Sequence, residues 1–420
     1  MTGKLKLAVH ELREGMFVAE LDRPWQDTPF LFQGFVLRSE KEIREICRYC
    51  QFVWVDRGRS EVELEQPAAN AENKRPSVLN RLLQVFSNET STTMSSPADV
   101  IEQDTPMREE LPRAGESIRH AENIVRDASD RLSLSETLEY SLVQSAVDPI
   151  IDSVLRNKDA MIWLQSMRGK SEYIFSRSVA CAVWGVIFGR HLGLDRTTLS
   201  HLAAGGLLLD LGKVSIPDEL LTRRGPLSEE EMDLVRRHVD TGVALLESNG
   251  EIDPVIIDMV RTHHERYNGT GYPHRLKGTE IPALGKIAGI LDTFVAMTSQ
   301  RPYADAMATQ DVMQHLTELA DVEFQGELVE QFIQAVGMFP TGSLVELSTG
   351  EVAIVTRQNR IKRLRPWVMI VTDANKQMLR EFRRIDLREA TTDDSGDHSL
   401  WIARGLPPGS CGIDPEEFFL

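Results

Sequence analysis

The chain has 420 residues, which is enough for two or three domains that each bury a core of their own. A net charge of −17 argues against broad electrostatic binding to nucleic acid, although a small anionic ligand could still occupy a local basic pocket. We see no apolar run long enough to span a bilayer and no secretory signal, and the four cysteines form no disulfide framework. These features predict a cytoplasmic protein.

Residues 1–62 predict a small α/β domain. The apolar, aromatic run Phe30–Arg38 is a strand candidate, and Phe52–Asp56 is a second one. Between them, Ser39 and Glu42 stand three positions apart, as in a capping box that begins a helix. Residues 63–115 are polar and rich in serine and threonine, so we expect a linker there.

Residues 116–339 predict an all-α domain, because apolar residues recur there at spacings of three and four. A second capping box, Ser228 with Glu231, begins one of its helices. Residues 340–388 then predict a β appendage with a hairpin followed by the strand Trp367–Val371. We expect the acidic tail, 389–420, to be loosely ordered. The predicted fold class is multi-domain and mainly α, with a small N-terminal α/β domain and a small β appendage.

Polar residues that could carry chemistry interrupt apolar parts of the helical region. His263 and His264 precede a glycine-rich loop, an arrangement that can aim two imidazoles at one metal ion. Asp210 and Asp292 lie in apolar stretches, where an unpaired carboxylate is costly and therefore needs a cation or a metal. Taken alone, Asp292 would be explained by a core salt bridge and His238 by a surface position.

The same region resembles the HD-GYP family. A segment near the N-terminus is similar to the DUF3391 domain that often precedes HD-GYP modules, and the β appendage is similar to an extension found in that subgroup. The resemblance rests on His263–Pro273, Leu276–Ile281, Leu209–Asp218, Ile287–Tyr303, Val9–Val18 and the segment from Pro340 onward.

The resemblance implies a bacterial phosphodiesterase that opens cyclic di-GMP with two or three divalent metal ions, commonly iron or manganese. It also implies roles for single residues. The family's metal ligands correspond to Asp210, His238, His263, His264 and Asp292. The family's lysine corresponds to Lys213, and its phosphate-contacting arginine corresponds to Arg301. The GYP loop corresponds to Gly271, Tyr272 and Pro273.

The match to the family pattern is incomplete. Leu209 replaces the histidine of the HD dyad, and Arg177 stands where the family has a ligand histidine. Ala304 replaces a usual basic residue, and Val295 replaces an aspartate. Both missing histidines belong to the same metal position, so the losses affect one half of the site.

These departures lead to the hypothesis that one metal position survives, held by Asp210 and the three histidines. In the other position the Arg177 guanidinium would neutralise Asp210 and Asp292 without supplying a nucleophile. The leading interpretation is a degenerate HD-GYP protein that binds at most one metal ion, or none, and acts as a cyclic di-GMP sensor or interaction module. Lys213 would matter for catalysis only if the protein is active.

Two alternatives stay open: a working phosphodiesterase with one metal or substitute ligands, and a structural partner with an empty pocket. The expected ligand is cyclic di-GMP or a related cyclic dinucleotide. A signalling protein could bind through the GYP loop or the N-terminal domain, and the oligomeric state, a homodimer included, is undetermined. We expect no nucleic-acid partner and no membrane span.

Overall fold

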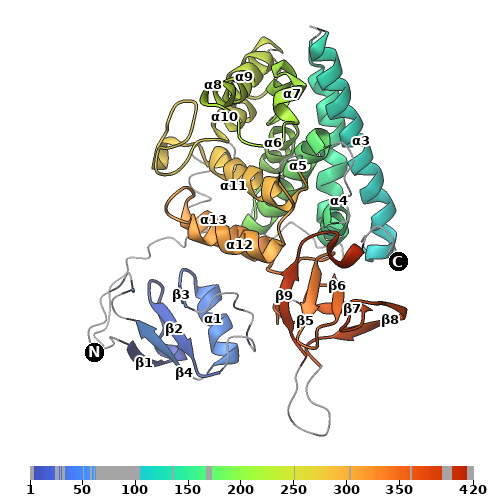
Figure 1. Ribbon diagram of the computed structural model, residues 1–420. Helices are drawn as coiled ribbons and strands as arrows, with labels where there is room; N and C mark the ends of the chain where they lie inside the picture. Colours follow the sequence, from blue (N-terminus) through green and yellow to red (C-terminus); the bar gives the residue numbers. More distant parts are fainter. Residues whose placement is uncertain are drawn as a thin grey trace.

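A computed structural model shows a helical body that carries two small β-containing parts (Figure 1). The expected fold class is confirmed. Most of the predicted linker, residues 63–104, lies outside the described residues. The same is true of Pro302 and Tyr303 in the family motif. The structure describes residues 4–23, 28, 30, 34–50, 52–56, 59–60, 62, 105–134, 137–166, 173–249, 251–301, 304–359, 362–389 and 400–413.

The N-terminal part is a four-stranded sheet, in the order β1-β4-β2-β3, with one helix. The Ser39 hydroxyl accepts a hydrogen bond from the Glu42 amide at 3.3 Å, so the predicted cap begins the helix. The predicted strand over Phe30–Arg38 is reduced to Phe35–Val36, and 31–33 lie outside the described residues. The elements are β1 (Lys4–Ala8), β2 (Phe17–Leu21), β3 (Phe35–Val36), α1 (Glu40–Tyr49) and β4 (Phe52–Asp56).

The helical body begins at Met107, directly after Pro106 and ahead of the expected start at residue 116. Its first two helices have 27 residues each and pack side by side. The predicted capping box of Ser228 and Glu231 is present. The helices are α3 (Met107–Ser133), α4 (Tyr140–Ser166), α5 (Tyr173–Leu192), α6 (Arg196–Leu208), α7 (Asp218–Leu221), α8 (Glu229–Arg236), α9 (His238–Asn249), α10 (Pro254–Thr262), α11 (Ala283–Thr298), α12 (Thr309–Glu318) and α13 (Gly326–Val336).

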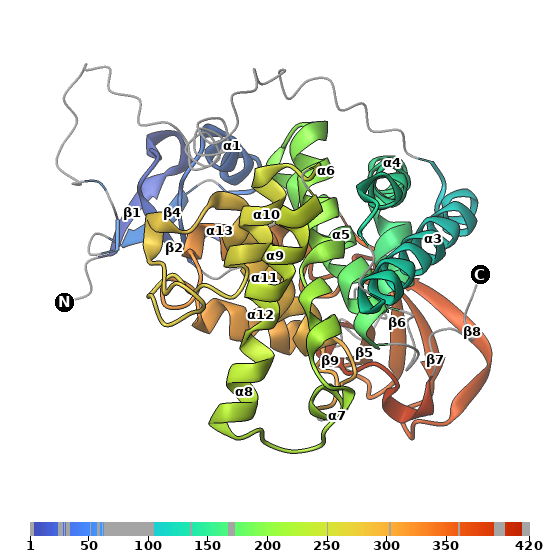
Figure 2. The same ribbon diagram turned by 90° about the horizontal axis from the view of Figure 1, so that it is seen from above.

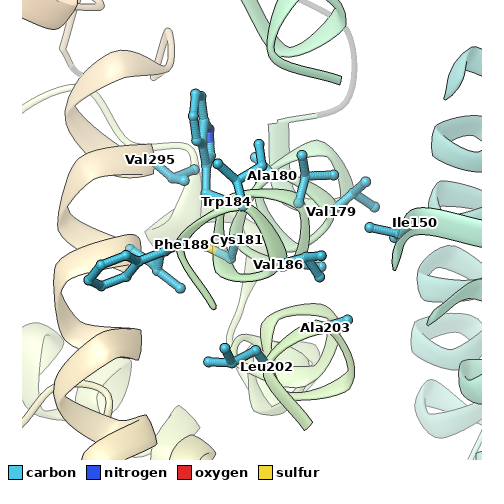
Figure 3. Packing of buried hydrophobic residues seen from close by; sticks show 14 of the residues in the cluster. Ile150, Val179, Ala180, Cys181, Trp184, Val186, Phe188, Leu202, Ala203 and Val295 are labelled. Carbon is cyan, nitrogen blue, oxygen red and sulfur yellow. The ribbon is translucent and has the colours of Figure 1, made fainter. Parts of the chain in front are cut away.

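Helix α5 runs through the centre of the body and is buried from Val179 to Phe188, with α4, α6 and α11 around it (Figure 3). A Cβ atom on Gly206 of α6 would lie 2.5 Å from the Ala182 nitrogen, so only glycine lets the two helices approach this closely. Rigid packing of this kind fixes where the ends of α5 and α6 point. Among the described residues, every helix is too short or too polar to cross a membrane.

The C-terminal part is a five-stranded sheet in the order β8-β7-β6-β5-β9. The predicted hairpin and third strand are present as β5, β6 and β7. The expectation of a loosely ordered tail is wrong for β9, which pairs with β5 and whose Gly405 amide donates to Gln310 Oε1 at 2.6 Å. The strands are β5 (Leu344–Leu347), β6 (Val352–Arg357), β7 (Trp367–Thr372), β8 (Met378–Asp386) and β9 (Ile402–Leu406).

Helices α7 and α8 form an arm that projects from the body, as the view from above shows (Figure 2). No residue of either helix is fully buried. The arm leads directly into α9, whose first residue is His238. The arm therefore continues into the polar centre of the body.

Candidate functional site

The polar residues predicted from sequence meet at one place, where the ends of several helices converge on α5 and α11. Packing of apolar neighbours brings them there, because each lies within or next to a helix that packs into the buried body. Five of the residues are at least nine-tenths buried, a costly position for charge that requires partners. The residues are Arg177 on α5, Asp210 and Lys213 after α6, His238 at the start of α9, His263 and His264 after α10, and Asp292 on α11.

Two of the histidines present lone pairs to each other. The Nδ1 atoms of His238 and His263 lie 2.6 Å from the carbonyl oxygens of Val235 and Val260. A carbonyl only accepts, so each Nδ1 carries the proton and each Nε2 is left with a lone pair. The two Nε2 atoms are 3.5 Å apart. Facing lone pairs at that distance repel unless a cation or a proton lies nearby.

Nitrogen atoms of His238, His263 and His264 all lie within 4.8 Å of one another. Burial lowers the pKa of all three imidazoles, that of His238 to about 4. They are therefore neutral near pH 7, which is the form that binds a metal. We call these three histidines, with Asp210 Oδ1, the histidine side of the pocket.

Asp210 divides its two oxygens between the halves of the pocket. Oδ2 lies 2.8 Å from Lys213 Nζ and 3.4 Å from Arg177 Nε. Oδ1 is buried, accepts no hydrogen bond and lies 3.8 Å from His238 Nε2. Asp210 Oδ1 and the imidazole lone pairs are all acceptors, and a group of acceptors of this kind suits a cation. The residues present therefore fit one divalent metal ion of the borderline class, iron or manganese included.

Arg177 links the two buried carboxylates. Its guanidinium forms ion pairs with Asp210 and Asp292, and the residue is 8% exposed. Burial alone would raise the pKa of both carboxyls. Lys213 and Arg177 outweigh burial at Asp210, and Arg177 does so at Asp292, so each pKa is held below its usual range. We call Arg177, Asp210 Oδ2 and Asp292 the arginine side.

Leu209 and Val295 contribute no polar atom to this pocket. Both are 1% exposed and belong to the hydrophobic core of the body. A histidine at position 209 would start from the end of α6, next to Asp210. The arginine side therefore contains carboxylates and a guanidinium, and Leu209 adds no imidazole to it.

The GYP loop covers the histidine side. The Tyr272 ring stacks on that of His264, with centroids 4.6 Å apart and 25° between the planes. A Cβ atom on Gly271 would lie 2.5 Å from the Glu265 Cα, so the loop can pass here only with glycine. The peptide bond between Tyr272 and Pro273 is cis. The loop thereby places one aromatic ring directly on a histidine of the cluster.

Glu265 is a site residue that the sequence analysis missed. Its carboxylate, 3% exposed, accepts hydrogen bonds from the amides of His274 at 2.7 Å and Leu276 at 2.9 Å. It therefore fixes the path of the loop after Pro273. An acid between a histidine pair and a glycine-rich loop was the available signal, but the sequence alone gave it no partner.

Arg301 follows α11, and its backbone amide donates to the Ala304 carbonyl at 2.9 Å. Its contact with a ligand phosphate remains a prediction.

Three family models match the chain. One described as "HD domain" covers residues 165–328, one described as "Domain of unknown function (DUF3391)" covers 4–142, and one described as "KOW domain associated with HD domain" covers 344–392. A cyclic di-GMP phosphodiesterase of Pseudomonas aeruginosa is 28% identical over 93% of this chain and 90% of its own length. The helical body therefore contains an HD domain, and the chain as a whole is similar to a cyclic di-GMP phosphodiesterase. The DUF3391 model extends beyond the N-terminal sheet, through α3 and into the start of α4.

Other relatives match about a third of the chain. A cyclic di-GMP phosphodiesterase of Thermotoga maritima is 33% identical over 34% of this chain and 39% of its own length. A 3'3'-cGAMP-specific phosphodiesterase of Vibrio cholerae is 34% identical over 34% of this chain and 27% of its own. The solved structure of an HD-GYP-type protein from Bdellovibrio bacteriovorus, 13% identical, covers 78% of this chain and 98% of its own, with a TM-score of 0.45.

Proposed function

We propose that this chain is an HD-GYP protein that acts in cyclic di-GMP signalling as a nucleotide sensor or interaction module, with phosphodiesterase activity absent or much reduced. The observation that carries the proposal is the Arg177 guanidinium paired with both Asp210 and Asp292. A fixed cation already neutralises the carboxylates that the family resemblance assigns to a second metal position. A metal ion entering there would have to displace a buried, doubly paired arginine.

His238, His263, His264 and Asp210 Oδ1 would hold a single divalent ion, iron or manganese. When bound, such an ion supplies positive charge and Lewis acidity to a phosphodiester oxygen. Lys213 holds Asp210 Oδ2 at 2.8 Å and so leaves Oδ1 directed toward the histidines. The histidine side thus keeps the means to bind a phosphodiester.

Hydrolysis also needs a nucleophile and stabilisation of the charge that develops on phosphorus. Arginine remains protonated at physiological pH and has no lone pair with which to hold a water-derived nucleophile. Loss of one ion from a two-metal site removes several kcal/mol of transition-state stabilisation, and each ~1.4 kcal/mol is about tenfold in rate. We therefore expect the protein to keep its binding of cyclic di-GMP and to have little or no hydrolysis of it.

A working phosphodiesterase that uses one metal is the second candidate. It is favoured by the intact histidine cluster and by the Pseudomonas aeruginosa relative, which is named a cyclic di-GMP phosphodiesterase and matches nearly the whole chain. A structural role with an empty pocket is the third. A protein partner would bind through the GYP loop or the N-terminal domain, and self-association into a dimer is compatible with either function.

Cyclic di-GMP binding and turnover, measured on one preparation of the full chain, test the proposal. Calorimetry with Mn²⁺ present should show binding, and chromatography of the same mixture should show no sustained formation of pGpG. The same assays on Asp210→Asn are the control, because that variant removes the carboxylate shared by both halves. Sustained conversion by the unmodified protein would establish the phosphodiesterase instead, and absence of binding would favour the structural role.

A further inference from the structure

We propose that Arg236, on the arm formed by α7 and α8, contacts a phosphodiester of the bound cyclic dinucleotide from the outer side of Tyr272. The inference rests on the proposed function, since it assumes that the pocket binds such a ligand. The Arg236 guanidinium carbon lies 5.8 Å from the centroid of the Tyr272 ring. That ring in turn stacks on His264. A cation therefore stands beyond the ring that covers the histidine side.

The position of Arg236 is coupled to the metal-binding residues through the chain itself. Arg236 is the last residue of α8, and His238 begins α9 two positions later. The Nδ1 proton of His238 is donated to the carbonyl of Val235, next to Arg236, at 2.6 Å. A ligand placed by the histidines therefore meets Arg236 in a defined direction, although α8 itself has no buried residue.

Other cations near the cluster have partners that a ligand could not cheaply replace. Lys213 and Arg177 neutralise buried carboxylates, and an unpaired buried carboxylate is expensive. Arg266 is bonded to Glu323 at 3.2 Å and donates to the Glu265 carbonyl at 3.0 Å, and its side chain is 18% exposed. Each of these arginines and lysines holds the pocket together.

Arg236 is different because its partners are exposed. It pairs with Asp233 at 2.7 Å and with Glu229 at 3.8 Å, and the side chains of those acids are 62% and 88% exposed. Exposed pairs contribute little to stability, so a phosphate can take the guanidinium at small cost. Arginine binds phosphate oxygens through two parallel N–H donors. Arg236 would thus supply positive charge to a ligand in the pocket.

The test measures binding of cyclic di-GMP and cyclic di-AMP to the full chain and to Arg236→Ala, with Mn²⁺ present. A phosphate contact predicts that affinity for both dinucleotides falls by a similar factor, about tenfold, because both have the same phosphodiester backbone. Arg236→Lys should recover part of the loss, since it keeps the charge. Metal content should stay at the level of the unmodified protein.

Arg223→Ala is the matched control. Arg223 belongs to the same arm, is similarly exposed, and pairs with Glu231 at 2.6 Å. Unchanged affinity in Arg236→Ala, an equal loss in Arg223→Ala, or a loss confined to cyclic di-GMP would each overturn the phosphate contact. The last result would indicate recognition of guanine. If the unmodified protein binds neither dinucleotide, the proposed sensor function and this contact both fail, whereas normal binding by Arg236→Ala removes only the contact.

Discussion

The two halves of the pocket differ in how their charge is balanced. On the arginine side, Arg177 and Lys213 offset Asp210 and Asp292, so that half is neutral as folded. On the histidine side, the Nε2 lone pairs of His238 and His263 face each other, and the unbonded Asp210 Oδ1 lies beside them. We propose that a side chain takes the place of an ion in the first half and that the second half still has a place for one. The same carboxylate, Asp210, serves both.

Under the proposed function, this difference means that a metal centre can lose catalysis without losing its fold. Two buried carboxylates require two units of positive charge, and the Arg177 guanidinium together with the Lys213 ammonium meets that electrostatic demand as a divalent ion does. It does not meet the chemical demand for a bound nucleophile. Substitutions that exchange cations between the halves should therefore separate folding, metal binding and hydrolysis.

The largest effect should come from restoring both missing imidazoles. In Arg177→His with Leu209→His, we expect a second metal ion to bind and hydrolysis of cyclic di-GMP to rise by about a hundredfold or more, because a second ion returns several kcal/mol of transition-state stabilisation. Metal analysis and the rate of pGpG formation measure the two effects. Leu209→His alone keeps the Arg177 cation and should gain neither. A reverted double variant with two ions and no turnover would assign the defect to Ala304, Val295 or the wider pocket.

Removal of the cation without replacement should unfold the pocket. Arg177→Ala leaves Asp210 and Asp292 short of a buried partner, and we expect a loss of about 3–5 kcal/mol in the free energy of unfolding, measured in urea with a chelator. Added Mn²⁺ should recover part of it. Arg196→Ala is the control, because Arg196 also bridges two aspartates, Asp148 and Asp152, but on the surface. Equal losses in the two variants would show that burial is irrelevant here.

The loop over the histidine side should depend on Glu265. Glu265→Ala removes the acceptor for the amides of His274 and Leu276, each a charge-assisted bond. We expect the variant to lose about 2–3 kcal/mol of stability and to bind cyclic di-GMP more weakly. Glu280→Ala, which removes an exposed acceptor for the Lys277 amide in the same loop, should change both by much less.

The smallest effect should be a pH dependence from the histidine side. Burial lowers the pKa of His238 to about 4, whereas an unfolded histidine titrates near 6.5. Between those values the unfolded chain binds the proton more readily, so stability is full above pH ~6.5 and falls as the pH drops toward 4. Each such histidine contributes a slope of about 1.4 kcal/mol per pH unit. Urea unfolding of chelated protein at pH 7, 6 and 5 should show this decline, and His238→Asn should reduce it.

Features set by neighbouring residues could be predicted from the sequence. The cap at Ser39 and the capping box at Ser228 begin helices as expected, because each Ser hydroxyl accepts a hydrogen bond from the backbone amide three positions later. Strands β5 to β7 were also predicted, because their apolar runs end at clear turns. Strand β9 was missed. Its residues Ile402–Leu406 gain a partner only from β5, far earlier in the chain.

In the functional site, too, local features could be predicted and long-range ones could not. Asp210, Asp292 and the histidines could be selected because acids and imidazoles are unusual in apolar helices. It could not be predicted that one Asp210 oxygen pairs with Lys213 and the other faces the histidines, since this depends on how α6 and α9 meet. The roles of Glu265 and Arg236 also depend on the path of a folded loop. Long-range geometry of this kind leaves no local pattern.

Metal stoichiometry of the purified full chain, reconstituted with Mn²⁺ or with Fe²⁺ under anaerobic conditions, tests the central claim most directly. The account predicts one ion per chain, lost in His263→Ala and retained in Asp292→Asn, because Asp292 is placed on the arginine side. Two ions per chain in the unmodified protein would contradict it, since the second could bind only where Arg177 now pairs with Asp210 and Asp292.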